Sequence, residues 1–223
     1  MTDTVPDETT ICRFRNKLVG NRLYEKLFED INKQLEEKGL VVRHGSIVVD
    51  ATLVRAHYRP SPPHEEAKDP DASWTVKQDK PHYGYKAHMS ADKDCELIRK
   101  VEITPAHVHD AEVFEELVVG DEQGVYADKG CYGQERRKYL ERRGIFCGIM
   151  EKAVHGRRLD QWRDKRNKFI SRVRGAVERR FGVLKKHYGC VRVKYGGIER
   201  NRCQLFLLAS AMNLKRILSL CPV

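Results

Sequence analysis

Two aspartates and one glutamate stand where the chain could bring three carboxylates together. Asp50 follows the β-branched run 47–49 in GSIVVDATLV, Asp128 closes GVYAD, and Glu178 lies within FISRVRGAVERRFGVLKK. Hard divalent cations such as Mg²⁺ bind oxygen ligands. Two such ions about 4 Å apart can activate an attacking oxygen and stabilise a leaving one in phosphodiester chemistry. Three convergent carboxylates therefore predict a two-metal site.

Each carboxylate also has a simpler interpretation. An Asp that closes a strand is often a turn residue bonded to its own backbone. Glu178 stands four residues after Arg174, so the two side chains can form a weak surface ion pair on a helix. The same helix carries an apolar stripe of Ile170, Val173, Val177 and Leu184. That stripe must face a sheet, which places Glu178 at the edge of the core.

The aspartates are expected to end short buried strands. GSIVVDATLV opens at Gly45 and contains a run typical of a strand buried on both faces, and GVYADKG and IFCGIM follow the same pattern. YGYKAHMSADKDCELIRKVEITPA alternates well enough for two antiparallel strands with a turn at 91–94. Residues 59–82 are polar and rich in Pro, which predicts a loop.

Helical patterns lie before and between these strands. Residues 15–39 form one apolar stripe that ends at Gly39, and HDAEVFEELVV is a short helix with Asp110 as its N-cap. Further helices are expected in QERRKYLERRG, at 164–187 and at 202–218. The element order predicts an α/β, ribonuclease-H-like mixed sheet with helices on both faces. We expect residues 1–43 to be a helical lead-in and 44–223 to be the catalytic domain.

Composition points to a polyanionic partner inside the cell. The formal net charge is +10, with a dense excess of Lys and Arg between Lys152 and Arg202. Basic side chains that neutralise phosphates release counterions and gain affinity. The seven cysteines are scattered and never form a C-x-x-C pair, which favours reduced thiols and a cytosolic protein. No apolar run is long enough to cross a membrane.

Six fragments carry a resemblance to a known family. They are PDETTICRFRNKL (6–18), GSIVVDATLV, GYKAH (84–88), TPAHVHDAEVFEEL (104–117), YADKGCYG (126–133) and R-x₃-E-x₆-K, which spans Arg174, Glu178 and Lys185. In this order they resemble the DDE transposases of bacterial insertion sequences, in the insertion-sequence-four-like superfamily and the group named after insertion sequence five.

The resemblance implies a role for each residue of the signature. Asp50, Asp128 and Glu178 would be the catalytic acids and would hold two Mg²⁺ ions, for which Mn²⁺ can substitute. The expected DNA-binding residues are Arg174, Lys185, Arg179, Lys186 and Lys86. The implied reaction is hydrolysis at the ends of the element, followed by attack of the freed 3′-hydroxyls on target DNA.

The same resemblance implies partners and a location. We expect double-stranded DNA of the element ends and target, a homo-oligomer assembled on that DNA, and the bacterial cytosol or nucleoid. Ser171 stands where the related signature often has Tyr, so no aromatic contact is expected there. Family members usually carry a larger helical region upstream, so we expect most of that region to be missing and DNA to be bound with little sequence preference.

Two other hypotheses stay open at this point. His107, His109 and Asp110, with His88, resemble a metal-ligand cluster and would suit a different metal hydrolase. A chain derived from a transposase could also be a catalytically idle DNA-binding remnant or regulator. Metal-dependent cleavage of plain duplex DNA distinguishes this last hypothesis from an active enzyme.

Overall fold

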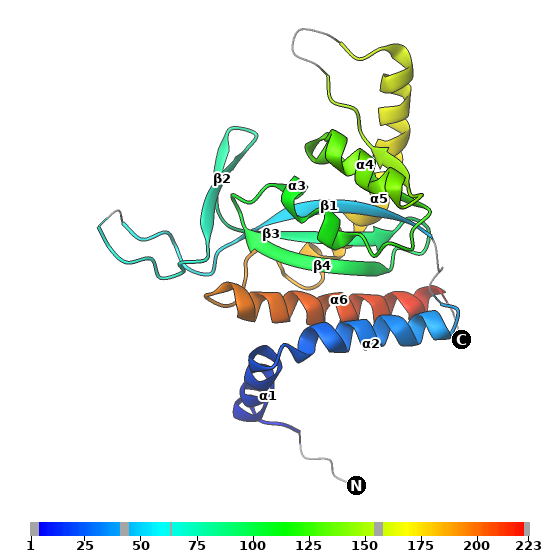
Figure 1. Cartoon of the computed structure of the whole chain (residues 1–223). Coiled ribbons are helices and arrows are strands. Elements are labelled where there is room, and N and C mark those ends of the chain that lie inside the picture. Colours follow the sequence, from blue (N-terminus) through cyan, green and yellow to red (C-terminus); the bar gives the residue numbers. More distant parts are fainter. Residues whose placement is uncertain (1–4, 41–44, 63, 154–157, 221–223) are drawn as a thin grey trace.

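The computed structural model describes residues 5–40, 45–62, 64–153 and 158–220 and contains a mixed sheet with helices against it (Figure 1). The strands are β1 (Ser46–Arg55), β2 (Ser73–Lys77), β3 (Lys80–Asp92), β4 (Ile98–Pro105), β5 (Gly124–Ala127) and β6 (Phe146–Ile149). The helices are α1 (Glu8–Gly20), α2 (Leu23–Glu37), α3 (Asp110–Val113), α4 (Gln134–Arg142), α5 (Gln161–Lys186) and α6 (Ile198–Leu220), with 3₁₀ turns η1 (Glu115–Leu117) and η2 (Lys129–Cys131). The predicted α/β class with a mixed sheet is confirmed.

The sheet has an antiparallel part and a parallel part. β3 pairs antiparallel with β1 on one side, and with both β2 and β4 on the other. β5 lies parallel to β1, and β6 lies parallel to β5. The expected antiparallel strands followed by alternating helices and strands are therefore present.

β1 is the central strand and contacts both layers of helices. Val48 belongs to the core beneath α5 and α6, whereas Ile47 and Val49 belong to the core beneath α3, η1 and α4. All three side chains are buried, with exposures of 0 to 2%. Burial on both faces explains the uninterrupted β-branched run.

The prediction that the first strand ends at Asp50 is wrong. β1 continues to Arg55, because its antiparallel pairing with β3 runs from Ile47 to Arg55. The parallel pairing of β1 with β5 stops at Val49. Asp50 is therefore the first residue of β1 beyond the end of β5. Asp128 follows β5 directly, as predicted.

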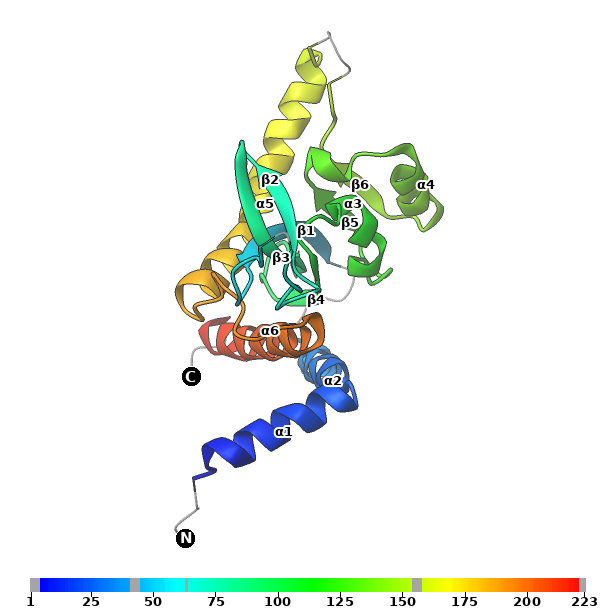
Figure 2. The same cartoon turned by 90° about the vertical axis from the view of Figure 1, so that its left-hand side faces the viewer.

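The predicted loop at 59–82 contains a strand, so this prediction was wrong in part. β2 pairs with the start of β3 in register Lys77↔Lys80, and Gln78 and Asp79 form a two-residue turn. Both turn residues are left-handed, with φ of 51° and 58°, as tight hairpin turns require. The β2–β3 hairpin projects from the sheet in Figures 1 and 2.

The N-terminal stripe forms two helices where one was expected. The chain breaks at Arg22, which has a left-handed φ of 50°, between α1 and α2. α2 then lies along α6 in both views (Figures 1 and 2), and the rings of Tyr24 and Phe28 meet that of Phe206 at 5.3 and 5.6 Å. The predicted cap at Gly39 is present, with φ 67°. The expected domain boundary at 43 and 44 lies outside the described residues.

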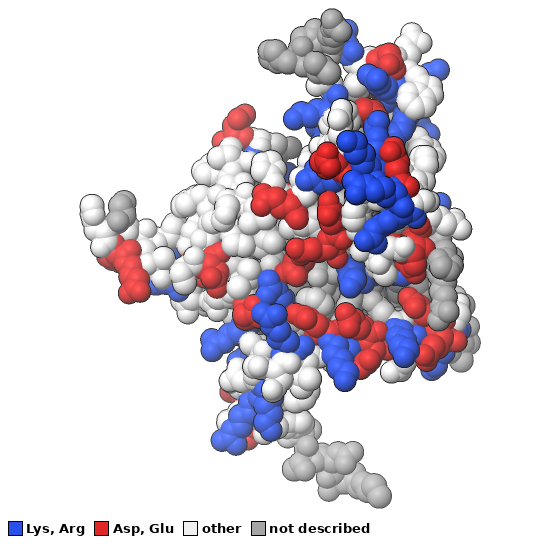
Figure 3. Space-filling model, viewed as in Figure 1, with Lys and Arg blue, Asp and Glu red and all other residues white. Residues whose placement is uncertain are grey.

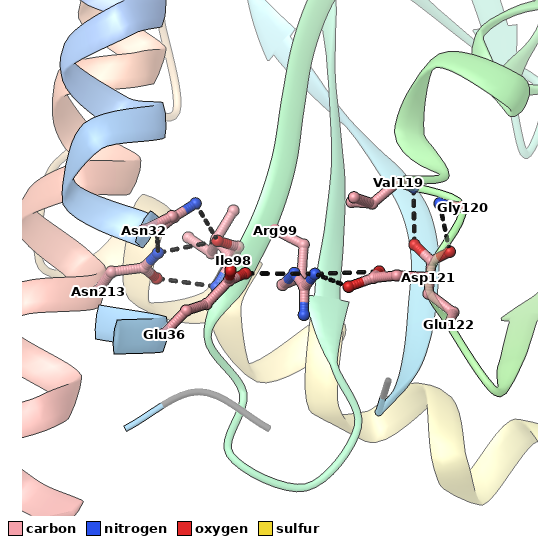
Figure 4. Close-up of polar contacts among 9 residues, drawn as sticks. All are labelled: Asn32, Glu36, Ile98, Arg99, Val119, Gly120, Asp121, Glu122 and Asn213. Atoms are coloured by element: carbon pink, nitrogen blue, oxygen red, sulfur yellow. Dashed lines mark hydrogen bonds and ion pairs between the residues drawn. The ribbon is translucent and has the colours of Figure 1, made fainter. Parts of the chain in front are cut away.

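Polar contacts fasten α2 and α6 to β4 (Figure 4). The Asn213 amide of α6 pairs with both the N–H and the carbonyl of Ile98, each at 2.8 Å, and it also donates to Asn32 of α2 at 2.9 Å. Arg99 next to it lies between Glu36 and Asp121 at 3.6 and 3.1 Å. The edge strand is thus held by residues from both ends of the chain.

Candidate active site

Helix α5 presents two charged side chains towards the sheet beside its apolar stripe. The helix begins at the N-cap Asp160, whose carboxylate accepts from the Arg163 N–H at 2.8 Å. The stripe residues Ile170, Val177 and Leu184 are 0 to 1% exposed, so the predicted buried face is confirmed. Arg174 and Glu178 stand one turn apart beside it, at the cavity described next.

A cavity of about 520 Å³ lies between α5 and the sheet. Its charged lining consists of Asp50, Asp110, Asp128, Glu178, Lys77, Lys86 and Arg174. The structure therefore brings the three predicted acids to one cavity, together with a fourth carboxylate and three cations.

Arg174 bridges the two aspartates. Its Nη2 donates to Asp50 Oδ2 at 2.7 Å, across 124 residues of sequence, and its Nη1 lies 3.6 Å from Asp128 Oδ1. The second oxygen of Asp50 is oriented by the backbone, because Oδ1 accepts from the Ala51 N–H at 2.9 Å. Asp128 also accepts from the N–H of Lys129 at 2.7 Å. One guanidinium group thus occupies the space that both carboxylates face.

Burial controls the protonation of this pair. It raises the pKa of Asp50, and the attraction of Arg174 reduces that rise without cancelling it. Burial acts to lower the pKa of Arg174, but Asp50, Asp128 and Glu178 raise it overall. Arg174 is therefore a permanent cation, whereas Asp50 holds its proton more tightly than an exposed carboxyl does.

Glu178 contributes its charge without a close partner. Among the described residues it forms no ion pair, although it lines the cavity and raises the pKa of Arg174. The simple surface pair between Arg174 and Glu178 is not formed, because Arg174 turns to Asp50. Glu178 thus remains exposed to solvent at the cavity.

The donor set suits hard cations in type and charge. Three carboxylates at one cavity offer the oxygen ligands that Mg²⁺ or Mn²⁺ binds. In the part of the chain that the structure describes, no three His, Cys, Asp or Glu side chains are close enough to hold one ion. Arg174 supplies the positive charge between Asp50 and Asp128 in this arrangement.

Comparisons with known proteins decide the family. Residues 43–214 match the family model described as "Transposase DDE domain". The chain belongs to the DDE transposase family. It is also 35% identical over 218 residues to the "Transposase for insertion sequence element IS1106" of Neisseria meningitidis serogroup B, an alignment that covers 91% of this chain and 75% of that relative.

The three histidines considered as metal ligands, His88, His107 and His109, do not line the cavity. His88 is 1% exposed, its Nε2 lies 2.8 Å from Thr104 Oγ1, and burial lowers its pKa to about 4. His107 contacts Ser73, and His109 is the N-cap of α3, so the prediction of Asp110 as N-cap is wrong. Asp110 is the first residue of the helix and pairs with Lys86 at 3.0 Å.

The basic residues expected to bind DNA have different surroundings in the structure. Arg174 faces the aspartates, Lys86 pairs with Asp110, and Arg179 donates to Glu96 at 2.6 Å. Lys185 and Lys186 form no ion pair among the described residues. Lys77 of the β2–β3 hairpin also lines the cavity. Lys77 was not predicted as a site residue because residues 59–82 were expected to form a loop.

The excess of Lys and Arg between Lys152 and Arg202 is partly neutralised by acids of the fold. In the view of Figure 3, Lys and Arg atoms gather over the region of α4, while acidic atoms lie over the centre. Several cations of α5 and α6 are paired with acids, including Arg180 with Glu96 at 2.7 Å and Arg202 with Glu102 at 2.9 Å. No helix in the described part of this family member is long and apolar enough to cross a membrane.

Proposed function

We propose that this chain is an insertion-sequence transposase, in the group named after insertion sequence five, that binds double-stranded DNA, cuts strands at the ends of the element and joins them to target DNA. The family membership supports the reaction class. The observation that carries the proposal is the pair of aspartates, 78 residues apart in sequence, that share one cation in a cavity that Glu178 also lines.

The strand order supports a ribonuclease-H-like fold. β4, β3 and β1 form an antiparallel set, and β5 and β6 extend it in parallel. In sheets of this kind, sites form where loops open a crevice beyond the strand ends. Asp50 and Asp128 both lie just past the point where β1 and β5 stop pairing.

The three acids have distinct tasks in this proposal. Asp50, Asp128 and Glu178 would hold two Mg²⁺ ions, or Mn²⁺ in their place, which activate the attacking oxygen and stabilise the leaving one. Asp50 and Asp128 are oriented by backbone N–H groups, so they are fixed before DNA arrives. Glu178 is exposed and is the acid that must move or be covered when DNA fills the cavity.

Arg174 has to release the aspartates when the cations are held. Its guanidinium then lies beside the DNA with its charge intact, because its pKa is raised. Charge-assisted bonds to phosphate oxygens are the natural replacement for those to Asp50 and Asp128. We propose that Arg174 alternates between these two sets of acceptors and that the protein acts as a homo-oligomer on DNA.

The test is cleavage of duplex DNA with Mg²⁺ or Mn²⁺ by the wild type and by Asp50→Asn. The substitution removes an anionic ligand and keeps the shape of the side chain. We expect a loss of more than about a hundredfold, since losing only an outer-shell partner already costs about 10- to 100-fold. DNA binding, measured separately by fluorescence anisotropy, should persist.

Asp30→Asn on α2 is the matched control, because Asp30 is exposed and lies outside the cavity. It should cleave as the wild type does. Equal cleavage by Asp50→Asn and wild type would contradict the assignment of Asp50 as a catalytic acid. A wild type that binds DNA but never cleaves it, with either metal ion, would favour the idle DNA-binding remnant instead.

A further inference from the structure

A second cavity, whose charged lining residues are all basic, adjoins the acidic cavity. It has a volume of about 310 Å³ and shares Thr52, Leu53 and Lys77 with the acidic one. Its charged lining is Arg55, Lys77, Lys80 and Lys185, and these four define what we call the lysine groove. No Asp or Glu is found among its described lining residues.

Three separate elements build the lysine groove. The β2–β3 hairpin supplies Lys77 and Lys80, β1 supplies Arg55, and the last turn of α5 supplies Lys185. Beyond it lies a further cavity of about 390 Å³ that shares Arg55 and Lys80 and adds Trp74 and Arg192. Arg55 and Lys80 thus line both cavities, and the charged residues that line each of them are all basic.

The four cations are not used in ion pairs among the described residues. Within the described ranges none of them forms an ion pair, whereas Arg174, Arg180 and Arg202 all do. Lys77 and Lys80 stand directly opposite each other across the hairpin, where like charges destabilise a strand pair. Burial lowers the pKa of Lys185, and the positive charge of Lys77 lowers it further. An anion in the groove would offset the repulsion between Lys77 and Lys80 and would stabilise the charged form of Lys185.

The hairpin is also poorly buried for its size. Trp74 and Val76 are 54 and 71% exposed, and β2 lies at the edge of the sheet. Two-stranded hairpins are marginally stable without a covering partner. Figure 2 shows the hairpin in front of α5, with its tip free of other elements. The hairpin therefore has both the charge and the open surface of a binding element.

We infer that the lysine groove binds the phosphodiester backbone of a DNA strand that runs to the acidic cavity. The inference rests on the proposed function and adds a contact region from the β2–β3 hairpin. A cavity lined by several unpaired cations suits a chain of phosphates, which carries a regular row of negative charges. Phosphate contacts of this kind fix the position of the strand and do not read its sequence.

The test is the salt dependence of duplex binding by Lys77→Gln/Lys80→Gln, measured by fluorescence anisotropy. Two lost phosphate contacts should flatten the slope of log K against log salt by roughly 1.8 units, at roughly 0.9 per contact. Lys26→Gln/Lys38→Gln on the surface of α2 removes the same charge far from the groove and should leave the slope nearly unchanged. Lys77→Arg/Lys80→Arg should keep the wild-type slope.

A second measurement covers the case in which the Gln variant misfolds. In the wild-type protein, DNA should protect Lys77 and Lys80 from acetylation more than it protects Lys26 and Lys38. If the wild type binds DNA while the Gln pairs behave alike and protection is uniform, the groove assignment is wrong and DNA binding stands. If the wild type shows no salt-dependent binding at all, the proposed function itself fails.

Discussion

The acidic cavity and the lysine groove are neighbours with opposite charge arrangements. In the cavity, Arg174 lies 2.7 Å from Asp50 and 3.6 Å from Asp128, so the fold supplies its own counter-charge. In the groove, Lys77, Lys80 and Lys185 have no acid among the described lining residues. In the cavity Arg174 contacts both aspartates, whereas the groove has cations alone among its charged described lining residues.

The difference distinguishes charged side chains that are paired within the fold from charged side chains that are free to bind an anionic ligand. Burying a charge without a partner is costly, so the half-buried pair of Arg174 and Asp50 supports the native structure. Exposed cations such as Lys77 and Lys80 cost little to leave unpaired in water. DNA can then supply the missing negative charge without displacing a protein group.

The largest effect after loss of cleavage should come from Arg174→Leu. It removes the cation that pairs with Asp50, whose side chain is 17% exposed, and breaking such a pair should lower the free energy of unfolding by about 3 kcal/mol. Urea unfolding measures this. Arg179→Leu is the control, because Arg180 still pairs with Glu96, and it should cost less than about 1 kcal/mol. Equal costs for both variants would mean that the cavity is no more dependent on its cation than the surface is.

The protonation of Asp50 gives a second, intermediate effect. Its pKa is already raised by burial, and Arg174→Leu removes the attraction that opposes this rise, so the pKa should rise further. A raised folded-state pKa makes the ionised carboxylate a cost to stability above that pKa. The stability of Arg174→Leu should therefore recover towards that of the wild type as the pH falls.

The measurement is the ¹³C chemical shift of the Asp50 carboxyl as a function of pH in both proteins, alongside urea unfolding at each pH. Arg179→Leu serves as the control, because it leaves the pair of Arg174 and Asp50 in place. An Asp50 titration that is unchanged in Arg174→Leu would contradict the geometry of the bridge.

The smallest effect should come from the groove, and it should have opposite signs for stability and binding. Lys80→Glu places an acid directly opposite Lys77, so the hairpin should gain about 0.5 kcal/mol of unfolding free energy. The same change should weaken binding to every duplex. Urea unfolding and anisotropy on one preparation measure both, with Lys80→Gln as the neutral control. A loss of stability would show that the lysines support the fold.

Local patterns predicted the elements better than their partners. The buried run at 47–49, the stripe of α5 and the cap at Gly39 follow from periodicity and residue type, and all three are present. β2 was missed because it is only five residues long, follows a Pro-rich segment, and ends at a Gln-Asp turn without Gly or Asn. The break at Arg22 follows Gly20 and Asn21, which end α1, but the apolar stripe runs across this turn signal, so one helix was expected.

Local sequence patterns could not predict which charged residues pair with each other. Arg174 has Glu178 one turn away, but its bond is to Asp50, 124 residues distant. Arg179 pairs with Glu96 and Lys86 with Asp110 for the same reason, because the sheet brings together strands and helices from separate parts of the chain. The triad itself came from a family resemblance, since each acid alone fits a turn or a surface pair.

The packing of α2 on α6 has a consequence for synthesis. The Asn32 and Asn213 side chains meet across 181 residues, and Tyr24 donates to Glu199. Contacts of such long sequence separation form late, because closing the loop between them is slow. While the ribosome is still making the chain, β4 and the apolar side of α2 have no cover. The sheet that carries the candidate site is covered by α2 and α6 only after α6 has been made, so shorter nascent chains should require protection from aggregation.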